Sequence, residues 1–253
     1  MIELAGKGVI VAGARRMGAV VASRLASEGV NLAITYRSSR KEAEALREGL
    51  SDKVERVTLI QADLANEAEV KKLIQKPQVD LGDLSFVVNL ASDFPRTPYD
   101  SLNSESWDEA MSFAKGSYLL ALHASRVMMS NSGPTRGHII QFSDWASSET
   151  PYRNYLPYLT AKASIEFMTR AFAVELAEHG VLVNTIAPGP TMRPPDIEEA
   201  VWRKAVVDHT PLKRESSTEE MAEFIVSLLR SETITGEVVR VDSGRHLAGA
   251  RAE

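Results

Sequence analysis

The 253-residue sequence contains no cysteine. This absence excludes disulfide bonds, a catalytic thiolate and any metal site built on cysteine. The five histidines are scattered and no two of them stand at metal-ligand spacing, so we expect no metal site. The formal net charge of −5 comes without a block of basic residues, which argues against binding to nucleic acid or to an anionic membrane surface.

Long apolar runs and a targeting leader are also missing. No run approaches the roughly 18 apolar residues of a membrane span, and Met1–Leu4 lacks the basic and apolar regions of a secretory signal. We therefore expect a cytoplasmic protein that acts on a small molecule. Hydrophobic residues make up 44% of the chain, enough for a sizeable core, and we find no linker or repeat, which predicts one domain over residues 1–253.

Apolar runs alternate with amphipathic stretches along the whole chain. The runs that predict strands are Gly8–Ala12, Val30–Tyr36, Val54–Gln61, Leu84–Asn89, His138–Phe142, Val181–Ile186 and Gly236–Val241. Helices are predicted over Ala19–Glu28, from a cap at Ser39 to Glu48, from a cap at Asn66 to Gln75, over Ser104–Ser130 with a break near Lys115-Gly116, and over Tyr155–His179, Ile197–Asp208 and Thr218–Ser231. This alternation predicts an α/β fold with a doubly wound parallel sheet of about seven strands, and such sheets bind ligands at the carboxyl ends of their strands.

One predicted helix carries a tyrosine and a lysine four residues apart. The spacing places Tyr158 and Lys162 on one helix face, one turn apart. A cation held roughly 4 to 5 Å from the hydroxyl, at an effective dielectric near 20, favours the phenolate by about 3 to 4 kcal/mol. We expect this to lower the tyrosine pKa by roughly two units, as a proton-transferring tyrosine requires. Such a pair taken alone is more often exposed on an amphipathic helix, so the neighbouring residues decide its meaning.

A glycine-containing turn follows the first predicted strand. Gly13 and Gly18 stand five residues apart, like the first and third glycines of G-x-G-x-x-G, but Arg15 replaces the middle glycine. Such a turn lets backbone N–H groups approach a pyrophosphate at the start of a helix. A plain strand–helix turn explains the two glycines about as well, and only the place of this turn in the first βα unit favours a dinucleotide.

The end of the second strand bears on the choice of cofactor. Folds that prefer NAD usually carry an acid there for the ribose hydroxyls. Here the stretch from Tyr36 to Ser39 is followed by no acid before Glu42. Arg37 and Ser38, with an arginine of the first turn, suit a 2′-phosphate, which predicts NADP(H) rather than NAD(H). The alternative is a solvated arginine in a loop.

Over nearly its full length the chain resembles the short-chain dehydrogenase/reductase family. The motifs that carry the resemblance are the Gly13–Gly18 turn, Asp63-Leu64, Asn89-Leu90-Ala91-Ser92, Trp107-Asp108, Tyr158 with Lys162, Val183-Asn184 before Pro188-Gly189, and Val241-Asp242-Ser243-Gly244. The resemblance implies a Rossmann-type fold and an oxidoreductase that moves hydride between a nicotinamide and a carbonyl, alcohol or imine carbon. It also implies a homo-tetramer built on the helix pairs that include residues 107–130 and 155–179.

The resemblance assigns roles to individual residues. It implies that Tyr158 is the general acid/base, and that Lys162 binds the nicotinamide ribose and lowers the Tyr158 pKa. Asp63 and Leu64 would flank the adenine, and Asn89 would lie along the cofactor and fix its strand. The complete set of expected cofactor-binding residues is Gly13, Arg15, Arg16, Met17, Gly18, Tyr36, Arg37, Ser38, Asp63, Leu64, Asn89, Ala91, Ser92, Tyr158, Lys162, Pro188, Gly189 and Thr191.

Three departures from the family pattern stand out. Ala12 replaces the usual threonine, and the glycine turn is one residue short. Asp144, directly after Ser143, falls where the family carries its catalytic serine. The helix after Trp107 lacks the family's proton-relay asparagine, since its residues 113–116 read Phe-Ala-Lys-Gly. Water alone, or Asp144, then has to carry the proton.

Among these reductases the chain is most similar to the pteridine reductases. They pair an aspartate at the serine position with the Tyr-x-x-x-Lys motif, as Asp144 does here, and carry an arginine at the position of Arg16. They also place an aromatic residue after Asn-x-Ala-Ser, as Phe94 does, and stack the pterin on it. The resemblance implies a pterin-like heterocycle as substrate, with Phe94, Ser143 and Trp145 near it.

Several alternatives remain open. Phe94 packs under the loop Pro95–Pro98 in one of them. In another, Asp144 caps a turn and Ser143 plays the usual serine role. Trp145 and Tyr152 either line the substrate pocket or only close the loop. A 3-oxoacyl-thioester reductase or another carbonyl reductase of the family is the alternative activity, and a catalytically silent dinucleotide-binding sensor is the alternative class. We expect the loop Pro190–Pro211 to close over the pocket and to set its specificity.

Overall fold

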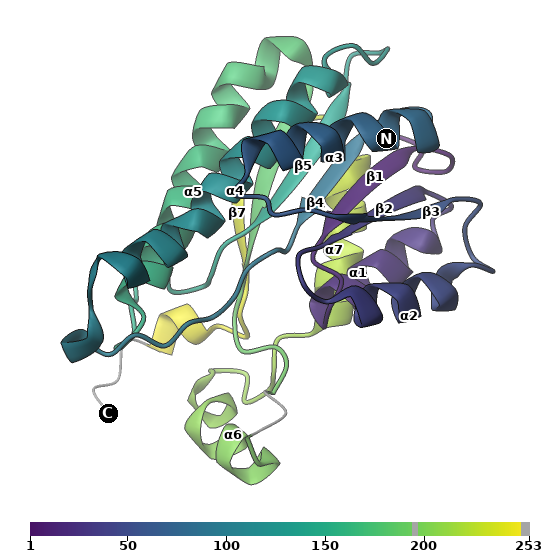
Figure 1. Ribbon diagram of the computed structural model, residues 1–253. Helices are drawn as coiled ribbons and strands as arrows, with labels where there is room; N and C mark the ends of the chain where they lie inside the picture. Colours follow the sequence, from purple (N-terminus) through teal and green to yellow (C-terminus); the bar gives the residue numbers. More distant parts are fainter. Residues whose placement is uncertain (194–196, 249–253) are drawn as a thin grey trace.

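All seven strands that the sequence predicts are present in one sheet. The computed structural model describes residues 1–193 and 197–248, without the side chains of residues 78 and 79. Seven parallel strands lie in the order β3-β2-β1-β4-β5-β6-β7 (Figure 1). They are β1 Gly8–Ala12, β2 Asn31–Tyr36, β3 Val57–Gln61, β4 Phe86–Asn89, β5 Gly137–Phe142, β6 Val181–Pro188 and β7 Val238–Val241. The helices are α1 Met17–Ala26, α2 Arg40–Leu50, α3 Glu67–Asp80, α4 Ser104–Met128, α5 Leu156–Leu176, α6 Glu199–Ala205 and α7 Thr218–Arg230. The predicted single-domain, doubly wound α/β fold is confirmed.

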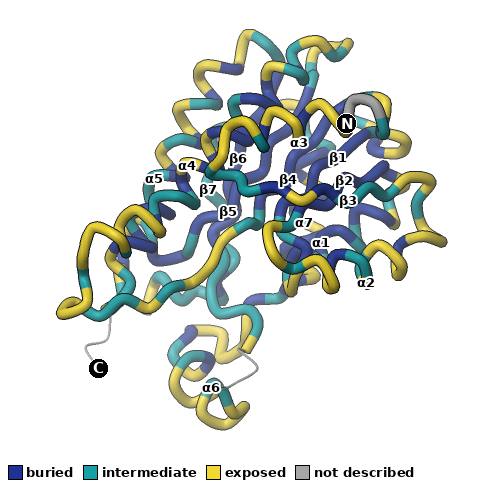
Figure 2. The backbone as a smooth tube through the Cα atoms, in the orientation of Figure 1, coloured by how far each residue is buried: buried dark blue, intermediate teal, exposed yellow. Residues whose placement is uncertain are grey.

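The two faces of the sheet bury two separate apolar cores. Val9 and Val11 of β1 pack with side chains of α1, α2 and α7. Ile10 and Ala12, which point to the opposite face, pack with side chains of α3, α4 and α5. Every residue of β1 is buried, because a strand covered on both faces has no solvent side (Figure 2). This explains why the strands read as continuous apolar runs rather than as alternating ones.

Of the two predicted helix caps, one is confirmed and one is wrong. The Asn66 side chain accepts hydrogen bonds from the N–H groups of Ala68 and Glu69 at 3.0 and 3.4 Å. Ser39 stands at the N-cap position of α2, but its side chain makes no capping hydrogen bond. Its ψ of 54° differs from the extended backbone that a capping residue usually adopts.

The predicted break near Lys115-Gly116 is also wrong, because α4 runs without interruption from Ser104 to Met128. Gly116 serves a close contact instead. A Cβ atom at this position would lie 2.9 Å from the Leu64 Cβ atom, in the loop that follows β3. The helix tolerates a glycine, which costs about 1 kcal/mol relative to alanine, because only glycine lets the helix pass this close to the loop.

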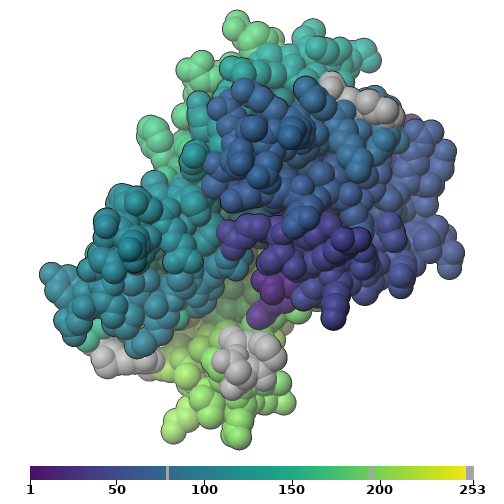
Figure 3. All heavy atoms as spheres, viewed as in Figure 1, coloured from purple at the N-terminus to yellow at the C-terminus, as the bar shows by residue number. Residues whose placement is uncertain are grey.

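A small lobe around α6 projects from the carboxyl edge of the sheet (Figures 1 and 3). It belongs to the loop Pro190–Pro211, of which residues 194–196 lie outside the described residues. Among the helices of the described chain, none has the length and apolar character needed to traverse a lipid bilayer.

Candidate active site

The predicted site residues follow strands that are neighbours in the sheet. β1 ends at Ala12, β4 at Asn89 and β5 at Phe142, and β4 is hydrogen-bonded to both of the others. Because the strands are parallel, the loops after them open at one edge of the sheet. The chain crosses from one side of β1 to the other between β3 and β4, and doubly wound sheets bind ligands in the crevice at such a point.

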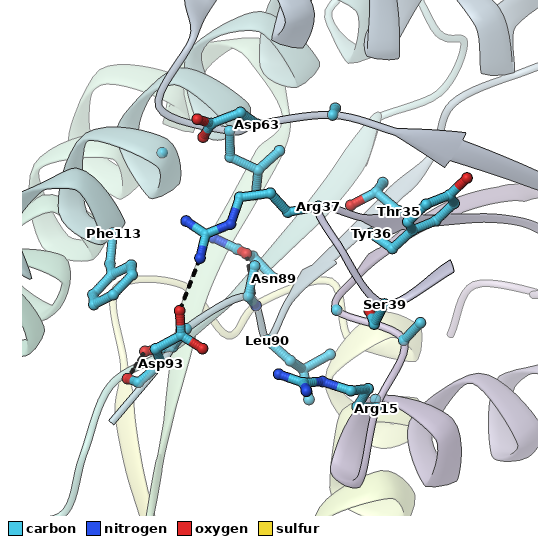
Figure 4. A pocket seen from close by; sticks show the side chains of 18 of the residues that line it. Arg15, Thr35, Tyr36, Arg37, Ser39, Asp63, Asn89, Leu90, Asp93 and Phe113 are labelled. Carbon is cyan, nitrogen blue, oxygen red and sulfur yellow. Dashed lines mark hydrogen bonds and ion pairs between the residues drawn. The ribbon is translucent and has the colours of Figure 1, made fainter. Parts of the chain in front are cut away.

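A cleft of about 300 Å³ lies at this edge, between the loops that follow β1, β2, β3 and β4 (Figure 4). Most of the expected cofactor residues line it, namely Gly13, Arg15, Arg16, Met17, Gly18, Tyr36, Arg37, Ser38, Asp63, Leu64, Asn89, Ala91 and Ser92. The remaining ones, Tyr158, Lys162, Pro188, Gly189 and Thr191, lie outside its lining. The structure therefore brings the residues expected at the adenosine and pyrophosphate into one cleft.

The turn after β1 is folded tightly around its two glycines. Gly13 has a φ of 102°, and a Cβ atom there would lie 3.3 Å from the Leu90 carbonyl carbon. A Cβ atom on Gly18 would lie 1.8 Å from the Gly13 carbonyl oxygen. This turn combines exposed backbone, the positive end of α1 and the side chains of Arg15 and Arg16. Together they fit the pyrophosphate of a dinucleotide.

An ion pair that the sequence analysis missed spans the cleft. Arg37 Nη2 lies 3.0 Å from Asp93 Oδ2, and the two side chains are 59% and 46% exposed (Figure 4). Asp93 directly follows the Asn89–Ser92 motif, so its position at the cleft was within reach of the sequence. Its pairing with Arg37 depends on β2 and β4 flanking β1. Here the carboxylate holds the guanidinium that was expected to bind a 2′-phosphate.

Asn89 fixes the floor of the cleft. Its Nδ2 donates to Ser117 Oγ at 3.0 Å and to Gln141 Oε1 at 2.9 Å, and its Oδ1 accepts from the Ala91 N–H at 3.2 Å. Gln141 Nε2 donates in turn to the Ser117 carbonyl at 3.1 Å. These bonds tie β4 to β5 and α4, which is the strand-fixing role that the family resemblance implied for Asn89.

Residues 113–116 of α4, the segment that lacks the relay asparagine, contact both the cleft and α5. Phe113 and Gly116 line the cleft, while Ala114 is buried against Ala161 and Ile165 of α5. An alanine methyl group cannot hold a water molecule or pass a proton. If a proton reaches the tyrosine of α5, it has to arrive by another route.

The Asp144 carboxylate lies at the centre of the second half of the site. Its Oδ2 accepts hydrogen bonds from the hydroxyls of Tyr152 and Tyr158, at 3.1 and 3.2 Å. Its Oδ1 accepts from the Ala146 N–H at 2.9 Å, so Asp144 caps the turn and contacts Tyr158 at the same time. The Ser143 hydroxyl is buried and has no hydrogen-bond partner among the described residues. The geometry thus places the aspartate, and not the serine, against the tyrosine.

Burial dominates the acid–base chemistry of this centre. It raises the pKa of the Asp144 carboxyl, although the Ala146 N–H, the two tyrosines and Lys162 oppose the rise. It also raises the pKa of Tyr158 well above the ordinary value, and the adjacent Asp144 charge raises it further. The expectation of a lowered Tyr158 pKa is therefore wrong for this arrangement, because a buried phenol beside a carboxylate resists ionisation.

Lys162 is buried and is held by a backbone carbonyl of β5. Its Nζ donates to the Phe142 carbonyl at 3.0 Å and lies 5.7 Å from the centroid of the Tyr158 ring. Burial lowers the pKa of Lys162 to about 8, against the opposing effect of Asp144. At neutral pH the side chain is still mostly an ammonium ion, roughly nine parts in ten. Lys162 thus supplies a positive charge near Asp144 and Tyr158.

Aromatic rings cover the tyrosine centre. Phe94 stacks on Tyr155 with centroids 4.4 Å apart and meets the Tyr158 ring edge-on at 4.9 Å. It is 55% exposed, and its ring contacts are with tyrosines rather than under the Pro95–Pro98 loop. Phe94 directly follows Asp93 of the cleft, so the chain leads from the cleft to the tyrosines. Tyr155 was missed, although its place three residues before Tyr158 was a usable signal.

Trp145 is less open than a substrate contact requires. It is only 8% exposed, its ring stacks on Tyr152 at 5.8 Å, and the Arg245 guanidinium lies 4.8 Å from its centroid. This matches the alternative in which Trp145 closes the loop.

The end of β6 approaches the cleft from the other side. Gly189 packs closely on Asp242, since a Cβ atom at Gly189 would lie 2.5 Å from the Asp242 Cα atom. The Arg16 guanidinium donates to the Met192 carbonyl. The segment around Thr191 is thereby tied to the glycine turn. Within the described part of the chain, no group of three or more histidine, aspartate and glutamate side chains is placed to hold a metal ion.

Comparisons with known proteins extend these observations. A sequence model of the family described as Enoyl-(Acyl carrier protein) reductase matches residues 11–246. The glucose 1-dehydrogenase of Gluconobacter oxydans is 29% identical over 259 residues, covering 98% of this chain and 94% of the relative. The hydroxynaphthalene reductase-like protein Arp2 of Metarhizium anisopliae is 28% identical over 262 residues, with 96% of each chain covered. A similar solved structure is that of FolM Alternative dihydrofolate reductase 1 from Brucella canis, complexed with NADP. Its TM-score is 0.87 and its sequence identity 27%, and the match covers 97% of this chain and 96% of that chain.

The Asp144–Lys162 interaction yields a first prediction. Because the Asp144 charge raises the pKa of Lys162, Asp144→Asn should lower that pKa from about 8 by roughly one unit. The titration of ¹³Cε-labelled lysine, followed by NMR and assigned with Lys162→Arg, measures it. Ser143→Ala is the matched control and should leave the titration in place. An unchanged Lys162 titration in Asp144→Asn would contradict the described geometry.

Proposed function

The chain belongs to the short-chain dehydrogenase/reductase family, and we propose that it is an NADPH-dependent reductase that transfers hydride to a C=O or C=N carbon. Relatives named as reductases and dehydrogenases match it over nearly their full length, and the chain is accordingly an NAD(P)-dependent oxidoreductase. The observation that carries the proposal of reduction is the 3.2 Å hydrogen bond between the buried Tyr158 hydroxyl and Asp144.

Tyr158 and Asp144 together can deliver a proton to the substrate. The bound nicotinamide would supply the hydride, and the residues of the chain supply the proton. Tyr158 holds its proton at neutral pH, and a substrate oxygen or nitrogen whose carbon has gained hydride becomes basic enough to take that proton, even though the Tyr158 pKa is raised. After this step the Asp144 carboxylate, whose raised pKa favours proton uptake, can take a proton from water and pass it to Tyr158 along their hydrogen bond. The Lys162 ammonium offsets the negative charge that remains. General acid help of this kind is typically worth about 10² to 10⁴ in rate.

Two features favour a flat heterocycle as the substrate. The exposed Phe94 ring stands beside Tyr158 and offers a stacking surface. A carboxyl group behind Tyr158 can supply protons to a ring nitrogen as well as to a carbonyl oxygen. The similarity to FolM Alternative dihydrofolate reductase 1, whose structure was solved with NADP, supports a pterin-like substrate here.

The second candidate is a carbonyl reductase, including a 3-oxoacyl-thioester reductase. The matching family is described by its enoyl-acyl-carrier-protein reductases, and one relative is named as a glucose dehydrogenase. The same Tyr158 and Lys162 would serve such a substrate, with Phe94 as part of the wall. A catalytically silent sensor has less support, because a binding protein has no need of a buried carboxylate against a tyrosine hydroxyl.

NADP(H) is the cofactor that the cleft favours. Arg37 stands at the end of β2, with Ser38 beside it, and no acid in this stretch opposes a 2′-phosphate. We infer that the phosphate takes the place of Asp93 as the partner of Arg37. A surface ion pair of this kind is worth only about 0 to 1 kcal/mol, so the exchange of partners costs little.

The mechanism predicts the effect of removing one hydroxyl. Tyr158→Phe should lower kcat by about 10² to 10⁴, while the Kd for NADPH stays within about threefold of the wild type. Loss of NADPH absorbance would be followed with dihydrobiopterin, dihydrofolate, an acetoacetyl thioester and simple diketones, which also separates the candidate activities. If Tyr158→Phe turns over a true substrate as fast as the wild type does, the mechanism is contradicted. If the wild type turns over none of the probes, the proposal of a reductase for these substrate classes is contradicted.

The cleft predicts opposite effects for the two members of its ion pair. Arg37→Ala should weaken NADPH binding by roughly 10- to 100-fold and leave NADH binding nearly unchanged, because it removes a charged partner of the phosphate. Asp93→Asn should strengthen NADPH binding a few-fold, because it frees Arg37. Quenching of tryptophan fluorescence by each nucleotide measures both. Equal binding of NADH and NADPH by the wild type, or an unchanged preference in Arg37→Ala, would count against NADPH.

We infer a homo-tetramer from an apolar surface on α4 and α5. Trp107 and Tyr118 on α4, and Phe167 and Val174 on α5, are between 43% and 78% exposed. Phe167 and Val174 stand seven residues apart and therefore share a helix face. Sedimentation velocity should show tetramers for the wild type and for Leu212→Glu, which changes an exposed apolar residue outside these helices, but smaller species for Phe167→Glu. A wild-type monomer, or a tetrameric Phe167→Glu, contradicts the inference.

A further inference from the structure

The Asp144 carboxylate has a second phenol partner that the family motif does not contain. Tyr152 donates to the same oxygen, Oδ2, as Tyr158 does. We propose that Tyr152 is a positioning residue that holds Asp144 against Tyr158 and stabilises its ionised form. For its effect on turnover the proposal rests on the reductase function above, but the effect on Asp144 itself does not.

The hydrogen bonds around Asp144 leave the carboxylate little freedom. Two hydroxyls occupy Oδ2, and the Ala146 N–H occupies one position on Oδ1. A carboxylate oxygen has about two lone-pair positions, so Oδ2 is fully used. Tyr158 comes from α5, whereas Tyr152 comes from the loop before it. Asp144 is therefore held both from the helix and from the loop that leads into it, and rotation away from Tyr158 breaks two bonds rather than one.

The ring of Tyr152 is itself fixed in place. It stacks on Trp145 with an interplanar angle of 30°, and Tyr155 meets it edge-on at 5.1 Å. The Arg245 guanidinium lies 4.8 Å from the Trp145 ring. A hydrogen bond of 2.6 Å from the Thr97 N–H to the Asn154 carbonyl ties this loop to the segment that carries Phe94. A ring packed in this way keeps its hydroxyl aimed at Asp144.

The substitution of aspartate for the family serine explains why a second donor is needed. A serine hydroxyl is neutral and tolerates burial with one or two hydrogen bonds. A buried carboxylate requires several donors to remain ionised, or it holds its proton instead. Tyr152 supplies one of these donors, and the Lys162 ammonium supplies the opposite charge. Asp144 and Tyr152 thus form a functional pair.

The charged and titratable groups that face Asp144 come from two segments. Tyr158 and Lys162 face it from α5, and Tyr152 faces it from the preceding loop. Behind them lie Tyr155, against the Tyr152 ring, and Arg245 of a third segment, against the Trp145 ring. The hydrogen bond from Tyr152 lowers the pKa of Asp144 and so opposes the effect of burial. Tyr152 does not itself ionise near neutral pH, because burial raises its own pKa well above the ordinary value. It acts as a fixed donor, and its removal should let Asp144 keep a proton to higher pH.

The direct test titrates Asp144 in the protein without substrate. The ¹³Cγ resonance of Asp144, assigned with Asp144→Asn, would be followed against pH in the wild type, in Tyr152→Phe and in Tyr155→Phe. Tyr152→Phe should move the titration upward by about one pH unit, as the loss of a hydrogen bond to a charged group predicts. Tyr155→Phe removes the same atom from a neighbouring ring that makes no hydrogen bond to Asp144, and should not move it. Equal titrations in Tyr152→Phe and Tyr155→Phe would overturn the proposal.

A kinetic test follows for the working enzyme. The pH dependence of kcat would be measured with NADPH and dihydrofolate. The part of the profile that reports Asp144 should move to higher pH in Tyr152→Phe and stay at the wild-type pH in Tyr155→Phe. In an Asp144→Ser background the Tyr152→Phe change should have no effect on the profile, because its partner is gone. A profile that does not move, or that moves equally in both tyrosine variants, overturns the positioning role. Failure of the wild type to turn over dihydrofolate bears only on the proposed function, since the NMR titration needs no turnover.

Discussion

A buried carboxylate shared by two phenols organises one half of the candidate active site. Asp144 gathers hydrogen bonds from Tyr152, Tyr158 and the Ala146 N–H, and a lysine ammonium lies close by. Burial makes negative charge costly here, so the pKa values of the carboxyl and of both phenols are raised. The two phenols consequently keep their protons at neutral pH. The oxygen or nitrogen formed by hydride transfer is a strong enough base to take a proton from such a phenol, which is the reductase chemistry we propose.

The fold explains how distant parts of the chain reach this centre. A parallel sheet with helices on both faces directs the loops after β1, β4, β5 and β6 to one edge. Because β4 lies next to β1 in the sheet, the Asn89–Ser92 segment lies alongside the glycine turn, and both line the cleft. Phe94, a few residues further on, already packs on Tyr158 of α5 and on Tyr155 just before this helix. Cofactor cleft and acid–base centre are thus joined by a single short stretch of chain.

Sequence periodicity predicted the strands well, because a strand buried on both faces must be apolar throughout, and Gly8–Ala12 matches β1 at both ends. Motif spacing also predicted most of the cleft lining, since the carboxyl ends of parallel strands share an edge. The pairing of Arg37 with Asp93 was not predictable, because it depends on which strands become neighbours and on side-chain conformation. The effect of Lys162 on Tyr158 was predicted wrongly for a similar reason. Helical spacing shows that two side chains share a face, but the Phe142 carbonyl, far away in sequence, takes the ammonium group.

The central claim is that an aspartate has taken over the place of the family serine, and one paired measurement tests it directly. The kcat values of Asp144→Ala and Ser143→Ala would be compared on a substrate that the wild type reduces with NADPH. The account predicts a loss of about 10² to 10⁴ for Asp144→Ala and a change of no more than a few-fold for Ser143→Ala. Near-full turnover in Asp144→Ala together with a large loss in Ser143→Ala would contradict it.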